Sequence, residues 1–145
     1  MFVTQDNQIP WNLLTPFSWD NPPDISFGRT KEICEKYTKH TLDLKSRNID
    51  INKYLADKYF TNDCYYSIDI NTFPYNLCEN IEHWIIWINP KYQHMIKTKN
   101  NIEVIIANNF YYGDKSKLKN VIYFENLECR RSIKCLPHIQ VFKLN

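Results

Sequence analysis

Apolar residues between positions 30 and 60 recur every three to four residues, the spacing of amphipathic helices. A first helix is predicted over 30–46, with Thr30 as its N-cap and Glu32 in its first turn. A second is predicted over 51–60, with Asp50 as its N-cap. The apolar positions that define these two helices are Ile33, Tyr37, Thr41 and Leu44, followed by Ile51, Tyr54, Leu55 and Tyr59.

After residue 60 the pattern changes to alternating or continuous apolar runs, which are typical of β-strands. The four predicted strands are 64–70, 81–88, 121–124 and 136–144. A third helix, capped by Asn100 or Asn101 and continuing to Phe110, is predicted between the second and third strands. This order predicts an α+β fold, in which about three helices pack on a mainly antiparallel sheet.

The first 28 residues differ from the rest of the chain in composition and pattern. They contain four of the seven prolines and two of the four tryptophans, with no helical period. We predict an extended aromatic N-terminal arm over 1–28 and a single α+β domain over 29–145, since 145 residues is the size of one domain.

Composition and charge narrow the function classes. The net charge is only +2 and the basic residues are scattered, which disfavours an extended nucleic-acid surface. There is neither an apolar run long enough to span a membrane nor an N-terminal secretory signal. Five cysteines without a CxxC pair favour a reduced, intracellular protein without a metal site, and no cofactor is predicted. Abundant Ile, Asn, Lys and Tyr, whose codons are AT-rich, fit a large DNA virus, and hence the host cytoplasm or the virion.

Two of the predicted strands carry a histidine. In residues 81–88 a period of two places His83, Ile85 and Trp87 on one face, and Trp84 on the other. His138 lies near the start of the last predicted strand, 136–144. If the two strands are neighbours, both imidazoles can act as acid, base or ligand in one site, or each can be a structural histidine bonded to a backbone carbonyl.

Several short motifs occur together in a recognisable order. They are Arg29-Thr30, Tyr37, Tyr54-Leu55, Phe73-Pro74-Tyr75, Glu82-His83-Trp84-Ile85-Ile86-Trp87, Phe124-Glu125-Asn126, Arg131-Ser132-Ile133 and Pro137-His138. Over residues 28–143 the chain thereby resembles the N-acetylglucosamine-induced protein 1 family, which occurs in fungi and large viruses. The resemblance implies an α+β fold with a site on the C-terminal strands, and it implies no particular reaction. Gln140 stands where the family has its second C-terminal histidine.

The C-terminal pattern is also similar, more faintly, to the histidine-triad nucleotide-binding proteins. In that family a histidine in the middle of the last strand attacks a phosphate. The corresponding position here is Gln140, and an amide forms no phosphohistidine. This similarity therefore implies binding rather than cleavage, and it leaves open whether the protein is an enzyme.

The first functional hypothesis is a binding protein for a nucleotide, a nucleotide-sugar or another phosphorylated small molecule. An arginine fork with neighbouring Ser and Asn donors suits the anionic part, although Arg131 can instead form a salt bridge with Glu125 or Glu128. Aromatic side chains suit stacking on a base. The candidate ligand-binding residues are His83, Trp87, Asn126, Arg131, Ser132, His138 and Gln140.

Two alternatives come from other classes of protein. The first is a virion-associated or host-interaction protein without a small-molecule site, which would dock a protein partner through exposed Trp11, Phe17 or Trp19 of the arm. The second is a protein that binds capped or single-stranded RNA through exposed aromatics beside the basic side chains of Lys97, Lys99 or Lys115.

Overall fold

The computed structural model describes residues 3–128, 131, 133 and 136–145. Its α-helices are α1 (Trp11–Leu14), α2 (Lys31–Ser46), α3 (Ile51–Tyr59), α4 (Gln93–Ile96) and α5 (Lys99–Phe110). Short 3-10 helices are η1 (Thr61–Asp63), η2 (Pro90–Tyr92) and η3 (Lys115–Asn120). The strands are β1 (Tyr66–Ile70), β2 (Ile81–Ile88), β3 (Val121–Phe124) and β4 (His138–Leu144).

The four strands form one antiparallel sheet in the order β1-β2-β4-β3. This confirms the α+β class with a mainly antiparallel sheet. The two histidine-bearing strands, β2 and β4, are central neighbours, and Trp87 lies opposite His138 while Ile85 lies opposite Gln140. Because side chains alternate along each strand, these four side chains and that of His83 share one face of the sheet.

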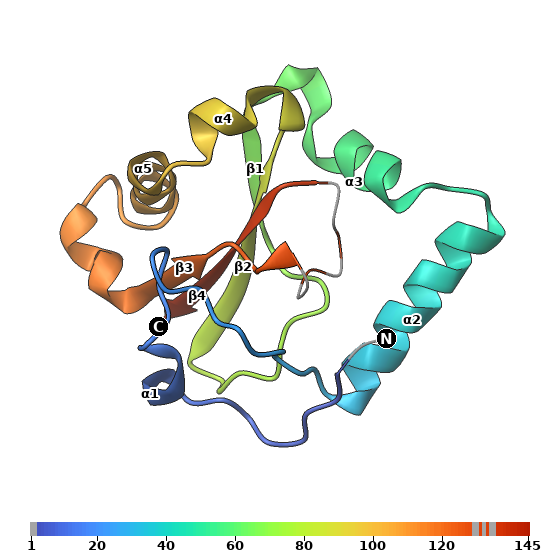
Figure 1. Cartoon of the computed structure of the whole chain (residues 1–145), viewed down its shortest axis with the longest axis horizontal. Coiled ribbons are helices and arrows are strands. Elements are labelled where there is room, and N and C mark those ends of the chain that lie inside the picture. Colours follow the sequence, from blue (N-terminus) through green and yellow to red (C-terminus); the bar gives the residue numbers. More distant parts are fainter. Residues whose placement is uncertain (1–2, 129–130, 132, 134–135) are drawn as a thin grey trace.

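One face of the sheet is covered by α5 and is almost wholly apolar. Ile102 and Ile106 of α5 are fully buried against Ile86, Ile139 and Val141 of the two central strands. Figure 1 shows α5 on one side of the sheet, with α2 and α3 on the other side. Burial of apolar surface contributes roughly 25 cal/mol of folding free energy per Å², so this interface is a main source of stability.

The opposite face carries the N-terminal arm at one end. Leu14 and Phe27 are buried against Phe124 and Phe142 of β3 and β4. Two parallel bridges fasten the arm to the domain, one of them with a 2.8 Å bond from the Gln5 N–H to the Arg29 carbonyl. The arm therefore contributes to the main core, and it contains the short helix α1, which was not predicted.

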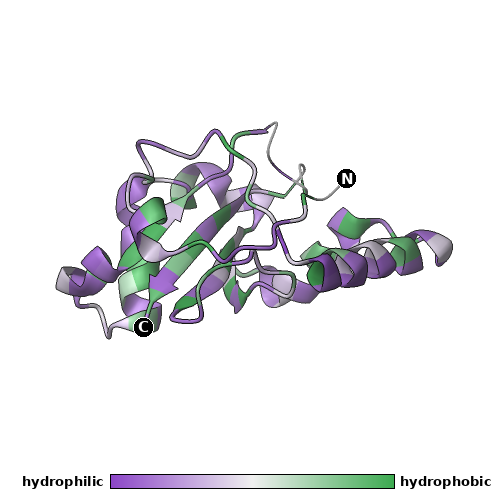
Figure 2. Ribbon diagram, turned by 90° about the horizontal axis from the view of Figure 1, so that it is seen from below, coloured by the Kyte–Doolittle hydropathy of each residue, from purple (hydrophilic) through white to green (hydrophobic). Residues whose placement is uncertain are grey.

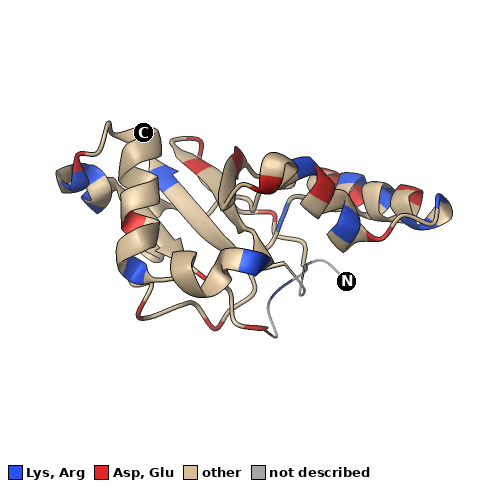
Figure 3. Ribbon diagram, turned by 90° about the horizontal axis from the view of Figure 1, so that it is seen from above, with Lys and Arg blue, Asp and Glu red and all other residues tan. Residues whose placement is uncertain are grey.

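The helices α2 and α3 lie over the other end of that face without packing closely on it. These helices have few buried residues, since α2 buries only Tyr37 and Leu44, and α3 only Leu55. Figure 2 shows α2 extending beyond the body of the molecule with a mixed polar surface. Figure 3 shows its interspersed acidic and basic residues beside a largely uncharged sheet. Space remains between the sheet and the two helices.

The boundaries of several elements differ from the prediction for identifiable local reasons. The predicted caps Thr30 and Asp50 are confirmed, because each side chain accepts a bond from a first-turn N–H. The predicted caps of the third helix, Asn100 and Asn101, are wrong. Thr98 caps that helix by accepting from the Asn101 N–H at 3.2 Å. The first and last strands start two residues later than predicted, at 66 and 138.

Candidate functional site

A cavity of about 110 Å³ lies between the sheet and the α2–α3 pair. Its floor is formed by the sheet residues Trp87, His138 and Gln140, with Ile85 between them. Its roof and walls come from three other parts of the chain. They are residues 29 to 40, α3, and the loop that follows β1, and they contribute Arg29, Tyr37, His40, Tyr54, Lys58, Tyr59, Asn71 and Phe73.

The charged residues of the cavity are all of one sign. Arg29 and Lys58 line it, and no acidic side chain does so among the residues that the structure describes. The buried Arg29 guanidinium lies 5.0 Å from the Tyr37 ring centre and 4.9 Å from that of Tyr75, and its Nε donates to the Phe73 carbonyl at 2.7 Å. These contacts hold the guanidinium in place. A cavity with this charge favours an anionic occupant.

Aromatic rings form the remaining walls in two stacked pairs. Tyr37 and Phe73 stack with 4.5 Å between ring centres and an interplanar angle of 11°. Tyr59 and Trp87 stack at 5.2 Å and 16°. The Tyr59 hydroxyl donates to Asp69 at 3.1 Å, which fixes that ring from behind. A planar group that enters between the two pairs meets aromatic edges and faces on both sides.

His83 lies next to Gln140 on the same face of the sheet and does not line the cavity. Its Nδ1 accepts a 3.2 Å bond from the backbone N–H of Tyr75, and its Nε2 lies 2.5 Å from Gln140 Oε1. Burial lowers the pKa of His83 from 6.5 to about 3, opposed by the bond to Gln140 and assisted by the charge of Arg29. His83 is therefore a neutral imidazole that positions Gln140.

His138 is a floor residue with one nitrogen already engaged. Its Nδ1 lies 2.8 Å from the Leu136 carbonyl, which can only accept, so Nδ1 carries the proton. Its ring lies 5.0 Å from that of Trp87. Burial lowers the pKa of His138, against the opposing effect of the Leu136 bond, so the ring is neutral and Nε2 keeps a lone pair at the cavity.

The structure brings three of the seven sequence-predicted ligand residues together at this cavity, namely Trp87, His138 and Gln140. His83 does not line the cavity, but it is hydrogen-bonded to Gln140. Trp84 points to the α5 face, where it packs on Phe110, as the alternation of the strand predicts.

The predicted anion-binding loop is arranged differently from the expectation. Arg131 donates to the Asn126 carbonyl at 2.8 Å and pairs with Glu125 at 3.3 Å, and it is not a cavity residue. Asn126 is buried and donates to the Tyr75 hydroxyl at 3.1 Å. Both residues thus make structural contacts, and Ser132 lies outside the described residues.

Sequence reasoning did not include the α2 and α3 side of the cavity among its ligand residues. Arg29, Tyr37 and Phe73 had a signal, because each belongs to a motif of the resembled family. Lys58 and Tyr59 had none beyond helical spacing, since only the tertiary arrangement brings α3 over the sheet.

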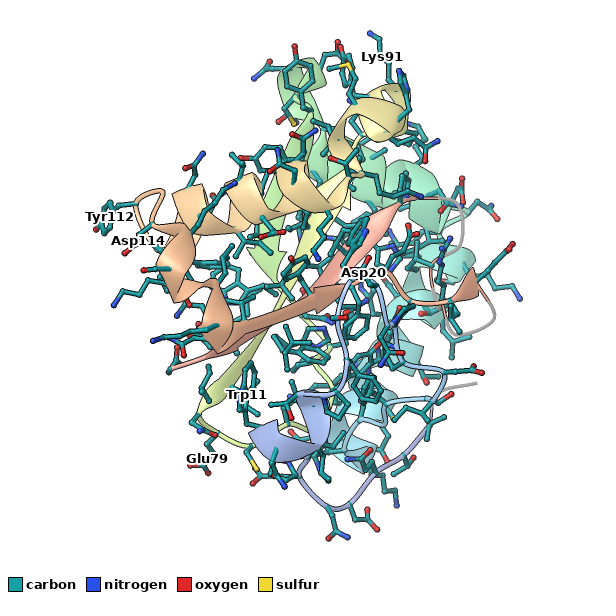
Figure 4. All side chains as sticks on the ribbon, turned by 60° about the vertical axis from the view of Figure 1, so that its left-hand side comes forward. Trp11, Asp20, Glu79, Lys91, Tyr112 and Asp114 are labelled. Carbon is teal, nitrogen blue, oxygen red and sulfur yellow. The ribbon has the colours of Figure 1, made fainter. Side chains whose placement is uncertain are left out.

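The two alternative hypotheses require exposed aromatic side chains in the arm or unpaired lysines beside exposed aromatics. Most of the residues named for these roles are instead packed or paired. Trp11, Phe17 and Trp19 of the arm are partly buried against the two main core clusters. Lys97 pairs with Glu125 at 3.1 Å and Lys99 with Asp20 at 2.9 Å. The most exposed large side chain described is Tyr112, which projects away from the body in Figure 4.

The described part of the chain offers neither a metal site nor a membrane-spanning helix. No cluster of three His, Cys, Asp or Glu side chains suited to a metal ion is found there. No helix in the same residues combines the length and the apolar character that a membrane crossing needs.

The fold and the cavity define a small α+β protein with an aromatic, cationic pocket on one face of an antiparallel sheet. The chain belongs to the family described as "Protein of unknown function (DUF3605)", which matches residues 25–143. No curated protein matches it. Among solved structures it is similar to one described as "Crystal Structure of HTC1", with 17% identity, a TM-score of 0.56, and coverage of 94% of this chain and 85% of that chain. At this identity the likeness shows the fold alone.

Proposed function

We propose that this protein binds a phosphorylated small molecule with a planar group, such as a nucleotide or a nucleotide-sugar, in the cavity beneath α2 and α3. The observation that carries the proposal is the chemistry of the cavity wall. Two cations, Arg29 and Lys58, stand among aromatic rings, and no described lining residue is acidic. Catalysis is not part of the proposal, because neither histidine of the sheet has a described carboxylate partner.

The two cations differ in burial and therefore have different roles in the proposed binding. Arg29 is buried and held by two tyrosine rings, so it keeps its geometry without a ligand. A preorganised guanidinium loses little entropy when it binds a phosphate. Lys58 is exposed on α3, with Nζ 5.1 Å from the Tyr59 ring centre, so it can reach an anion at the mouth of the cavity.

The wider biological setting follows from the sequence. The chain resembles the N-acetylglucosamine-induced protein 1 family, and its abundance of Ile, Asn, Lys and Tyr, whose codons are AT-rich, suits a large DNA virus. We infer an intracellular protein, an inference supported by the three described cysteines, Cys34, Cys64 and Cys78, which are all free thiols.

The test is a thermal-shift screen followed by calorimetry with nucleoside 5′-monophosphates, nucleotide-sugars, sugar phosphates and inorganic phosphate. A ligand at about 100 times its dissociation constant adds roughly 2.7 kcal/mol of stability, which is a clear shift. If no phosphorylated compound in the panel shifts the transition, the proposal is wrong.

A matched pair of lysines on α3 locates the site. Lys58 lines the cavity, whereas Lys53 is exposed on the same helix and pairs with Asp57 at 2.8 Å. Lys58→Ala should weaken phosphate binding by roughly fivefold at low salt, and less at high salt because the charge is screened. Lys53→Ala should leave the affinity unchanged. Equal effects of the two substitutions would place the anion elsewhere.

A further inference from the structure

Two groups donate toward the His83 ring. Asn71 Nδ2 lies 3.4 Å from Nδ1 and 3.3 Å from Nε2 and so favours neither nitrogen, whereas the backbone N–H of Tyr75 lies 3.2 Å from Nδ1 alone and sets the direction. The backbone N–H of Tyr75 can only donate, and it donates to Nδ1 of His83. Nδ1 therefore has no proton. Since the buried ring is neutral, the proton is on Nε2, which faces Gln140.

The state of His83 sets the orientation of the Gln140 amide. The His83 N–H needs an acceptor at 2.5 Å, so the carbonyl oxygen of Gln140 faces it and the NH₂ group faces away. Gln140 is 4% exposed and lines the cavity. No side-chain acceptor for its NH₂ group occurs among the residues that the structure describes. The floor thus presents a buried hydrogen-bond donor at position 140.

His138 supplies the complementary group on the same face, two residues away along β4. Its Nδ1–H donates to the Leu136 carbonyl, so its Nε2 is an acceptor. His138 is 5% exposed and also lines the cavity. One oriented donor and one oriented acceptor therefore occur on the same face of the sheet, on two residues that both line the cavity.

We propose that this pair selects nucleotides with an oxo base, namely uracil, hypoxanthine or guanine. The base carbonyl accepts from Gln140 and the adjacent ring N–H donates to His138, while the phosphate contacts Arg29 and Lys58. This inference rests on the proposed function and names its ligand class.

Amino bases are disfavoured because they carry a hydrogen-bond donor at the base edge where an oxo base carries an acceptor. Where uracil and guanine carry an acceptor oxygen, cytosine and adenine carry a donor amino group. With the phosphate held at the cations, the base cannot turn over, so an amino group would face the donor at Gln140. A buried donor left without an acceptor loses binding free energy. A ring N–H of an oxo base is also more acidic than an amino N–H, so it is the better donor to an imidazole.

The first experiment uses the unmodified protein and matched ligand pairs. Calorimetry compares inosine with adenosine 5′-monophosphate and uridine with cytidine 5′-monophosphate, with ribose 5-phosphate as the base-free reference. We expect the oxo member of each pair to bind at least about tenfold more tightly. Equal affinities within both pairs, or tighter binding of the amino members, would overturn the inference and leave the proposed function standing. Failure of all five compounds to bind would also overturn the inference, whereas the proposed function is overturned only if the nucleotide-sugars, the other sugar phosphates and inorganic phosphate of the wider panel fail as well.

Two substitutions separate base selection from general weakening. Gln140→Met removes the donor at similar side-chain length, and it should reduce the preference for inosine over adenosine 5′-monophosphate, because only the acceptor of His138 then distinguishes the two bases. Lys58→Ala should weaken both nucleotides while the ratio of their dissociation constants stays the same. If Gln140→Met binds and keeps the ratio, position 140 does not read the base. If this variant does not fold, the comparison of the ligand pairs on the unmodified protein still decides.

Discussion

The buried, neutral state of His83 predicts a specific loss of stability in mild acid. The pKa of His83 is about 3 in the folded protein, against 6.5 for an exposed histidine, chiefly because the ring is buried. Between these two values the unfolded chain binds a proton that the folded protein does not bind. The free energy of unfolding therefore falls as the pH falls from 6.5 toward 3, and the contribution of His83 is complete only above 6.5.

The size of the effect follows from the two pKa values. One proton taken up on unfolding lowers stability by about 1.36 kcal/mol per pH unit. From His83 alone we expect a loss of about 1.4 kcal/mol at pH 5.5 and about 2.7 kcal/mol at pH 4.5, relative to pH 8. The pKa of His138 is lowered too, so this residue acts in the same direction. Losses of this size are a large part of the roughly 5–15 kcal/mol that stabilises a domain.

The assay is urea denaturation at pH 8.0, 6.5 and 5.5, a range in which most carboxylates stay ionised. His83→Gln removes the titrating group and keeps an amide that can both accept and donate. This variant should lose about 1.4 kcal/mol less than the unmodified protein between pH 8.0 and 5.5. His94, exposed on α4, provides the control position, and His94→Gln measures the effect of replacing a histidine outside the core. If His83→Gln shows the same pH dependence as the unmodified protein, His83 is not the group that resists protonation.

Three further predictions concern stability and are checked by the same denaturation at pH 8. Ile106→Val in the fully buried face of α5 should cost about 1 kcal/mol, whereas Leu42→Ala on the exposed face of α2 should stay within about 0.5 kcal/mol. Gly28→Ala should destabilise by more than about 1 kcal/mol, because its Cβ would lie 2.3 Å from Cβ of Gln5, and limited proteolysis should then cleave the arm first. Gly113→Ala should cost about 1 kcal/mol, because φ is +84° at this position.

The α+β class was predictable because the two hydrophobic periods are well separated along the chain. Helical spacing in residues 30–60 and β-branched, aromatic runs such as 81–88 each determine one element, and capping residues such as Thr30 fix the ends. The start of β4 was less predictable. Leu136 is apolar and buried, as a strand residue would be, but regular pairing with β2 begins only at His138.

The candidate site was predictable only as far as the sheet. Alternation along β2 predicted that His83 and Trp87 share one face. The observed register with β4 adds His138 and Gln140 to that face, and Trp87, His138 and Gln140 line one cavity. The cationic side was not accessible in this way, because no local rule states that α3 lies over that face. Arg131 shows the converse limit, since an arginine in a polar loop has the same sequence signal whether it binds phosphate or pairs with Glu125.

The pair His83 and Gln140 gives a physical reason why either glutamine or histidine can occupy position 140. A glutamine accepts the His83 N–H through its oxygen and presents an N–H donor to the cavity. A neutral histidine can do the same, with one ring nitrogen accepting and the other donating. Both residue types would therefore keep one hydrogen-bonding pattern. Leucine has similar volume and can make neither bond.

We therefore expect Gln140→His to lie within about 1 kcal/mol of the unmodified protein, since the His83 N–H retains an acceptor. Gln140→Leu should be less stable than Gln140→His by about 1–3 kcal/mol, because it leaves the buried His83 N–H without an acceptor. Urea denaturation at pH 8, where His83 is neutral, measures both. Exposed Gln93 on α4 is the control position, and Gln93→Leu should change little. If Gln140→Leu proves as stable as Gln140→His, the floor is held by packing alone, and the oriented donor that the base-selection proposal needs is not fixed.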